Sequence, residues 1–230
     1  MDRKLIIKKP ENVDILLICE GTFPYIKGGV SSWIYQIING LDEFNFGIVF
    51  IGGNPEDYGE IKYDIPHNVV HLETHFLFDF KSGYEKKEEI EGDKDLVLKM
   101  RSLHYWFRKH GDVLNDELKK FNFYEKIDEK QFLYSKNSYE FIREEYYKNA
   151  SNVPFIDYFW TIRNIHAPIW KIVSIAKNIV DFKLVHSPST GYAGFLAAFL
   201  KENYNKKFVL TEHGIYLLER KIDIMLSNWI

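Results

Sequence analysis

Short apolar runs alternate with polar turns and helix-period segments at both ends of the chain. The first run, Val13 to Cys19, is interrupted only by Asp14, which is the composition of a strand buried on both faces of a parallel sheet. A glycine-rich loop follows, and apolar residues then recur at helical spacing from Val30 to Leu41. Strand, loop and helix form the first half of a βαβ unit. Such a loop brings backbone N–H groups and a helix N-terminus to one point, which favours anion binding.

The same alternation continues further along the chain. It predicts an α/β fold with a Rossmann-like, doubly wound parallel sheet. The other predicted strands are Phe46–Ile51, Asn68–Leu72, Phe182–His186 and Lys207–Thr211, with a helix of small residues at Tyr192–Leu200.

Residues 76 to about 150 break this alternation and are predicted to be a helical insertion. Within it, Lys81–Asp95 is dense in charge and is expected to be a loop or the polar start of a helix. Leu96–Tyr147 contains no proline and predicts two or three short helices. Two further helices are expected, one from Asp157 to about Val180, kinked or divided at Pro168, and one over Ile215–Ile230.

Composition excludes several classes of protein. The net charge of −3 and the pI of about 6.3 leave no electrostatic footprint for nucleic acid. The one cysteine, Cys19, suits a reducing cytoplasm, and the N-terminus lacks the apolar region of a signal peptide. No stretch approaches the ~20 apolar residues of a transmembrane segment, so we expect a cytoplasmic protein. Aromatic residues make up 17%, and we assign Trp33, Trp160 and Trp170 to the core.

Three polar loops follow three of the predicted parallel strands. They contain Gly28–Gly29, His186–Gly191 and Glu212–Gly214. Because ligands of open parallel sheets bind beyond the carboxyl ends of the strands, we expect these loops to meet at one crevice. Two histidines, several hydroxyls and a glycine pair then make the candidate active site.

Other kinds of site fit the sequence poorly. The first loop lacks G-x-G-x-x-G and the second strand ends in Gly52–Gly53, which argues against a dinucleotide site, and no Walker loop is present. His67, His71 and His75 recur every four residues, but the segment reads as a strand, on which fourth neighbours cannot share a metal ion. We therefore predict no metal site.

Three segments carry a family resemblance. They are Glu20–Ile38 (EGTFPYIKGGVSSWIYQII), His186–Gly194 (HSPSTGYAG) and Thr211–Ile224 (TEHGIYLLERKIDI). Together they resemble the N-terminal half of bacterial family-four glycosyltransferases, in the branch that includes the Pel-exopolysaccharide synthesis glycosyltransferase. The resemblance covers essentially the whole chain and is weakest over residues 76 to 150.

The resemblance implies a GT-B fold, in which two Rossmann-like domains flank the active site. Such enzymes transfer a sugar from a nucleotide-sugar, commonly a UDP-sugar, to an acceptor with retention and without a required metal or other cofactor. It assigns Gly28 and Gly29 to the donor diphosphate and His213 to the donor sugar. In this chain Leu217 and Leu218 replace expected polar residues, which leaves Glu219 and Arg220 as the charged candidates, with Arg220 assigned to the donor.

Residues 1–230 are accordingly expected to be a single acceptor-side domain, with the C-terminal nucleotide-sugar-binding domain absent and the isolated chain inactive. Its expected partners are a nucleotide-sugar, a carbohydrate acceptor, the missing domain and a polysaccharide-synthesis complex. The alternatives are a non-catalytic carbohydrate- or nucleotide-binding module and a structural partner in such a complex.

The residue roles also have alternatives. His213 and Glu212 are the catalytic candidates, although His213 can be a structural histidine and Gly28–Gly29 a tight turn. The residues assigned to acceptor binding or to structure are Tyr25, His186, Ser189 and Thr190. We favour a structural role for His186, and for Ser189 and Thr190 we favour N-caps of the helix at Tyr192.

Overall fold

The computed structural model describes residues 7–8, 12–78, 90–108, 116–126, 129–214, 218, 221–222 and 225. The chain divides into two compact units. The first contains residues 1–80 and 175–227, and the second contains residues 81–174 and 228–230. The second unit includes most of the predicted insertion and continues beyond it. The expectation of a single acceptor-side domain stays a prediction.

The first unit is built on a six-stranded sheet in the order β1-β4-β3-β2-β5-β6. Strands β2 to β6 are parallel, whereas the two-residue β1 pairs antiparallel with β4 at the edge. The predicted doubly wound α/β fold is therefore confirmed. The strands are β1 Ile7–Lys8, β2 Val13–Glu20, β3 Phe46–Gly52, β4 Val69–Phe76, β5 Phe182–Ser187 and β6 Lys207–Leu210.

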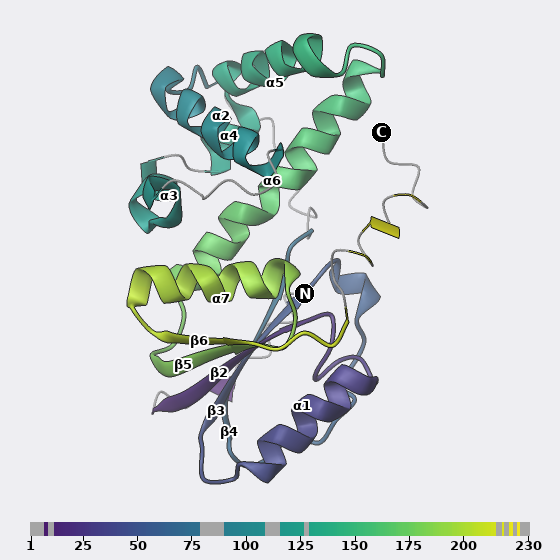
Figure 1. Ribbon diagram of the computed structural model, residues 1–230, viewed down its shortest axis with the longest axis vertical. Helices are drawn as coiled ribbons and strands as arrows, with labels where there is room; N and C mark the ends of the chain where they lie inside the picture. The colour runs from purple at the N-terminus through teal and green to yellow at the C-terminus, as the bar shows by residue number, and fades with distance from the viewer. Residues whose placement is uncertain are drawn as a thin grey trace. The chain divides into compact units, whose positions relative to one another are not determined.

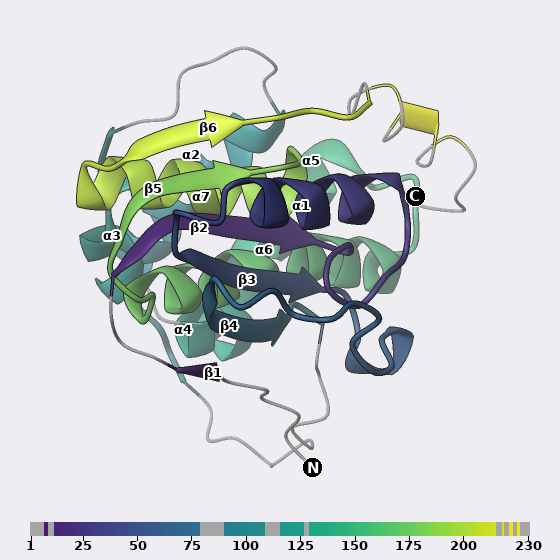
Figure 2. The ribbon, with the colours of Figure 1, turned by 90° about the horizontal axis from the view of Figure 1, so that it is seen from below.

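Helices cover both faces of this sheet. Helix α1 (Gly29–Gly40) follows β2 on one face, and α7 (Gly191–Tyr204) follows β5 on the opposite face (Figures 1 and 2). All seven residues of β3 are buried, as expected for a central parallel strand between two helical layers. The main core lies under α1, where Ile34 and Ile38 are fully buried against β2, β3 and β4.

A buried asparagine fixes the C-terminal end of α1. The side-chain amide of Asn68 donates to the carbonyl oxygens of Ile38 (2.9 Å), Leu41 (3.3 Å) and Phe44 (3.3 Å). Carbonyls at a helix end have no partner within the helix, so this side chain supplies one. A short 3-10 turn, Pro55–Asp57, lies between β3 and β4.

The second unit is helical. Arg101 of α2 pairs with Glu144 of α5 at 2.7 Å, and the Trp170 ring of α6 stacks on Phe132 of α4 with centroids 4.7 Å apart. Its helices are α2 Lys94–Arg108, η2 Asp116–Lys119, α3 Phe121–Lys126, α4 Glu129–Tyr134, α5 Lys136–Asn149 and α6 Phe155–Lys177, the last of which continues into the first unit.

Several sequence predictions change in detail. The third predicted strand continues to Phe76, and Pro168 lies inside α6 without dividing it. Trp170 is buried as predicted, whereas Trp160 is 43% exposed and the prediction that it belongs to the core is wrong. Most of the predicted Lys81–Asp95 loop and of the Ile215–Ile230 helix lies outside the described residues. Within the described part of the chain, no helix has the length and apolar character needed to cross a bilayer.

Candidate functional site

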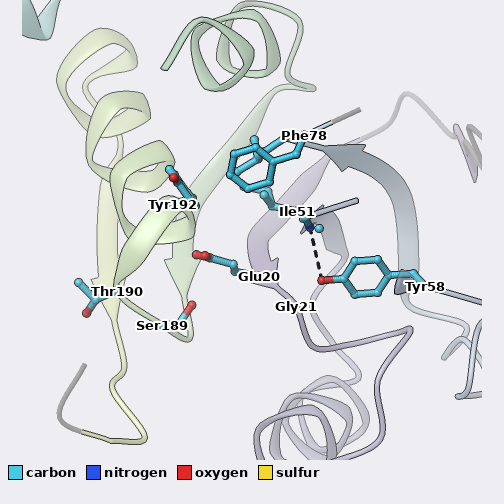
Figure 3. Close-up of a pocket in the computed structure, with 11 residues that line it drawn as sticks. Glu20, Gly21, Ile51, Tyr58, Phe78, Ser189, Thr190 and Tyr192 are labelled. Carbon is cyan, nitrogen blue, oxygen red and sulfur yellow. Dashed lines mark hydrogen bonds between the residues drawn. The ribbon is translucent and has the colours of Figure 1, made fainter. Parts of the chain in front are cut away.

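The first unit contains a cavity at the carboxyl ends of its parallel strands. The chain winds from β2 outward to β3 and β4 and then returns to β5 on the other side of β2, so the strand order reverses between β2 and β5. Open α/β sheets bind ligands at such a point. The cavity has a volume of about 330 Å³ and is bordered by the residues that follow β2, β3, β4 and β5 (Figure 3).

Glu20, the last residue of β2, supplies a carboxylate to this cavity. One of its oxygens accepts a hydrogen bond of 2.9 Å from the backbone N–H of Ala193 in the first turn of α7. The residue at the N-cap of α7, Thr190, makes no side-chain cap bond. Glu20 therefore places a negative charge at the positive end of α7, where a carboxylate is stabilised.

Hydroxyl groups border the same cavity. Ser189 Oγ is buried and has no hydrogen-bond partner among the described residues. Thr190 Oγ1 donates to the carboxylate of Glu212, which follows β6. We predicted that Ser189 and Thr190 cap α7. Thr190 does occupy the N-cap position, but its side chain makes no capping hydrogen bond, and the carboxylate of Glu20 accepts the bond from the first turn instead.

Aromatic side chains also border the cavity. Figure 3 shows Tyr192 on the same side as Ser189 and Thr190, and Phe78 and Tyr58 on the other side of Glu20. The Tyr58 hydroxyl accepts a 3.5 Å hydrogen bond from Gly53 N–H. A Cβ atom on Gly52 would lie 2.7 Å from the Tyr58 ring and 2.9 Å from Phe76. Glycine is required there because the rings occupy the space that a side chain would need.

A second cluster joins α1 to the end of β5 and to the segment after β6. The Trp33 ring lies edge-on to His213 (centroids 4.6 Å apart) and to His186 (5.8 Å). His186 Nε2 is 2.9 Å from Thr211 Oγ1. Burial lowers the pKa of His186, and the neighbouring His213 lowers it further, so the neutral imidazole is favoured. The favoured structural role of His186 agrees with these contacts.

The glycine pair lies at the start of α1. Gly28 is the N-cap and Gly29 the first residue of the helix, four positions before Trp33. Both glycines are exposed, and a Cβ atom on either would meet no atom within 4 Å. Through Trp33, the helix that begins at this pair contacts His213. That the glycine pair and the His213 imidazole face one crevice stays a prediction.

The predicted site residues divide into three groups. Ser189 and Thr190 line the cavity, whereas Gly28, Gly29, His186, Glu212 and His213 are absent from its lining. Tyr25 is buried, with its hydroxyl 2.9 Å from Thr74 Oγ1, and these contacts fit the structural alternative better than acceptor binding. Arg220 lies outside the described residues.

Sequence reasoning missed Glu20, Tyr58, Phe78 and Tyr192. For Glu20 a signal existed, because an acidic residue directly follows a buried strand and precedes Gly21. The aromatic residues had no such signal, since aromatic residues are frequent throughout the chain.

His71 and His75 lie on β4, His71 within the predicted strand and His75 beyond its predicted end, whereas His67 precedes the strand. Glu73 stands between the other two imidazoles, with Oε1 3.7 Å from His71 Nε2 and Oε2 3.3 Å from His75 Nε2. Burial alone would raise the pKa of Glu73, but the two imidazoles outweigh it and lower the pKa to about 2. Among the described residues, no three His, Cys, Asp or Glu side chains are arranged to hold a metal ion.

Fold and site together define a Rossmann-like α/β protein with a cavity at the switch point of its sheet. A family model matches residues 13–230, and the chain belongs to that family, DUF3492, described as a domain of unknown function. Neither a curated protein nor a solved structure matches the chain.

Proposed function

We propose that this chain is the acceptor-side unit of a retaining glycosyltransferase that transfers a sugar from a UDP-sugar to a carbohydrate acceptor in exopolysaccharide synthesis. The DUF3492 family is associated with glycosyltransferase-like proteins. The motifs after β2, β5 and β6 resemble the Pel-exopolysaccharide branch of family-four enzymes.

The open glycine pair at the start of α1 is the observation that carries the proposal. Gly28 has an extended backbone (φ 174°), and neither glycine is crowded, so conformation and packing leave either position open to another residue. Two adjacent glycines that neither conformation nor packing requires support a ligand that approaches the backbone closely. A leaving diphosphate gains charge in the transition state, which N–H groups at a helix N-terminus would stabilise selectively.

The other helix of the crevice is unsuited to the diphosphate. The N-terminal end of α7 already holds the carboxylate of Glu20, which would repel a second anion. The same carboxylate suits the hydroxyl groups of a sugar, which donate hydrogen bonds. With Ser189 beside it and the rings of Phe78 and Tyr192 around it, the cavity fits one unit of the acceptor.

His213 and Glu212 take the roles near the reacting centre. The Trp33 ring supports the His213 imidazole, which can bond a hydroxyl of the donor sugar. Glu212, held by Thr190, orients His213 or binds an acceptor hydroxyl. In this proposal the remaining contacts to the nucleotide come from a second domain, so these residues by themselves bind the donor weakly.

The test is a titration of the chain with UDP-sugars, followed by NMR, for the wild type and for Gly28→Ala. We expect the substitution to weaken binding about tenfold or more, and to lower the urea midpoint only slightly, because alanine is a poorer N-cap than glycine. Gly40→Ala is the matched control, because Gly40 lies at the other end of α1 and is equally uncrowded. Equal binding by all three proteins would refute the phosphate role of the glycine pair.

Sugar transfer is tested separately. The assay measures UDP released from a UDP-sugar by any longer protein that contains this chain, with and without the substitution His213→Ala. Loss of turnover in a folded variant would support the enzyme. Donor binding without turnover in the unsubstituted protein would instead favour the non-catalytic binding module.

A further inference from the structure

The ring of Tyr58 is fixed at one side of the cavity in the first unit. This residue follows the 3-10 turn Pro55–Asp57, and its backbone N–H donates to the carbonyl of the first residue of that turn at 3.3 Å. The ring lies edge-on to Phe50, with centroids 5.0 Å apart, and is tilted against Phe76, with centroids 5.8 Å apart. Gly52 has no side chain, which leaves the space that the ring occupies. The contacts that hold the ring also hold the hydroxyl in one place.

The Tyr58 hydroxyl lies between the ends of β2 and β3. A Cβ atom on Gly21, the residue after β2, would lie 3.7 Å from the hydroxyl oxygen, and the N–H of Gly53, directly after β3, donates to it at 3.5 Å. Both glycines line the cavity, and Figure 3 shows the hydroxyl pointing from the Tyr58 ring towards the side of Glu20. The hydroxyl therefore lies at the wall of the cavity, beside two neighbouring strand ends.

The packing of the ring does not require this hydroxyl. Two of the rings around Tyr58 belong to phenylalanines, and a phenylalanine at this position would make the same ring contacts. The bond from Gly53 is longer than an ordinary N–H···O hydrogen bond, and it is the one hydrogen bond of the hydroxyl within the described part of the chain. The oxygen accepts in that bond, so its proton stays available to an oxygen atom of a ligand.

We propose that Tyr58 is a specificity-determining residue of this cavity, and that its hydroxyl donates a hydrogen bond to one hydroxyl oxygen of a neutral sugar. A sugar hydroxyl both donates and accepts, so one sugar ring can donate to the carboxylate of Glu20 and accept from Tyr58. A sugar without that hydroxyl would leave the Tyr58 proton unpaired, and a site built to bond a hydroxyl rejects such an analogue. The hydrogen-bond donor follows from the contacts of Tyr58, whereas the choice of a sugar rests on the proposed function.

The test combines a change in the protein with a change in the ligand. NMR titration measures the binding of methyl glucoside and methyl galactoside to the whole chain, and then of each singly deoxygenated derivative of the tighter binder. In the wild type we expect the loss of one particular sugar hydroxyl to weaken binding about three- to tenfold, the range of one neutral hydrogen bond. Tyr58→Phe should weaken binding of the parent sugar by the same factor. It should also bind the parent and that derivative equally, because both changes remove the same bond.

Tyr63→Phe is the matched control. Tyr63 lies on the same segment between β3 and β4, its hydroxyl makes a similarly long contact of 3.4 Å to Ser32 Oγ, and the residue is absent from the cavity lining. This variant should bind every probe as the wild type does. Both substitutions keep the aromatic ring, and urea unfolding checks that both variants are folded.

The proposal is overturned if neither sugar binds, if Tyr58→Phe binds the parent sugar as tightly as the wild type does, or if each deoxygenation has the same effect in Tyr58→Phe as in the wild type. It is also overturned if Tyr63→Phe has the effect expected of Tyr58→Phe. Weaker sugar binding by Glu20→Gln together with unchanged binding by Tyr58→Phe would overturn this inference and leave the proposed function standing. The UDP-sugar titration of Gly28→Ala tests the donor site independently.

Discussion

A buried histidine in the helical unit should make that unit sensitive to mild acid. His166 on α6 is 1% exposed, its Nδ1 lies 2.8 Å from Ile162 O, and its ring packs 5.3 Å from His104 and 5.2 Å from Phe132. Burial lowers the pKa of His166 from 6.5 to about 4; the bond to Ile162 O opposes this, and His104 adds to it.

The sign of the effect follows from which state binds the proton. Below pH 6.5 the unfolded chain protonates this histidine while the folded chain does not. The stability that the neutral ring contributes is complete above pH 6.5 and is lost as the pH falls towards about 4. At ~1.4 kcal/mol per pKa unit the full loss is about 3 kcal/mol, of which about 2 kcal/mol is lost by about pH 5.

The assay is urea unfolding, followed by circular dichroism at about pH 7.5 and about pH 5, for the wild type, His166→Leu and the exposed-site control His67→Leu. Leucine has nearly the volume of histidine and cannot be protonated. We expect the wild type and His67→Leu to lose about 2 kcal/mol more between the two pH values than His166→Leu does. Equal losses in all three proteins would refute the assignment of the acid sensitivity to His166.

Three further predictions concern the sheet. The Glu73 carboxylate, whose pKa in the folded state is about 2, should contribute up to about 3 kcal/mol to the free energy of unfolding above pH 4.5 and lose this contribution as the pH falls towards 2. Glu73→Gln should remove this contribution, which is checked by urea unfolding at a series of acidic pH values. A loss of stability in acid that is the same in the variant and the wild type would contradict the prediction. Gly52→Ala should cost about 1–3 kcal/mol in urea unfolding, since its Cβ would lie 2.7 Å from Tyr58, whereas at Gly53 the nearest atom is 3.7 Å away and alanine should cost under about 0.5 kcal/mol. Glu20→Gln keeps an oxygen that can accept the bond from Ala193 N–H but removes the negative charge. Binding of a neutral sugar, measured by NMR titration, should therefore fall about tenfold, while the free energy of unfolding changes by less than about 1 kcal/mol. Unchanged binding would place the acceptor elsewhere.

The sheet was predictable because its signal is local. A run such as Phe46–Ile51 is apolar on both faces, and the structure buries it on both faces as part of β3. The end of β4 was harder to predict because it contains His71, Glu73 and His75 on one face of the strand. Polar residues usually signal the end of a buried strand, but here they pair with one another.

The sequence predicted at which edge of the sheet the candidate site lies, but not which side chains line it. Of the three loops that were expected to meet, the two after β5 and β6 are joined by the hydrogen bond from Thr190 to Glu212, whereas a meeting of the glycine pair with them stays a prediction. Which side chains border the cavity depends on contacts between residues far apart in the chain. The bond from Ala193 N–H to Glu20 spans 173 positions, and no spacing rule in the sequence encodes it.

The bond between Glu20 and Ala193 also makes the N-terminal ends of α1 and α7 electrostatically different. Two helices begin at the switch point, and each N-terminus carries the same partial positive charge. The chain fills one of them with Glu20 and begins the other with two uncrowded glycines. In the proposed function, this difference directs the anionic donor to α1 and a ligand that donates hydrogen bonds to the cavity beside α7. Removing the charge at position 20, as in Glu20→Gln, should therefore weaken the sugar site and raise the affinity of the first unit for inorganic phosphate. A phosphate affinity that does not change would show that Glu20 has no part in this selection.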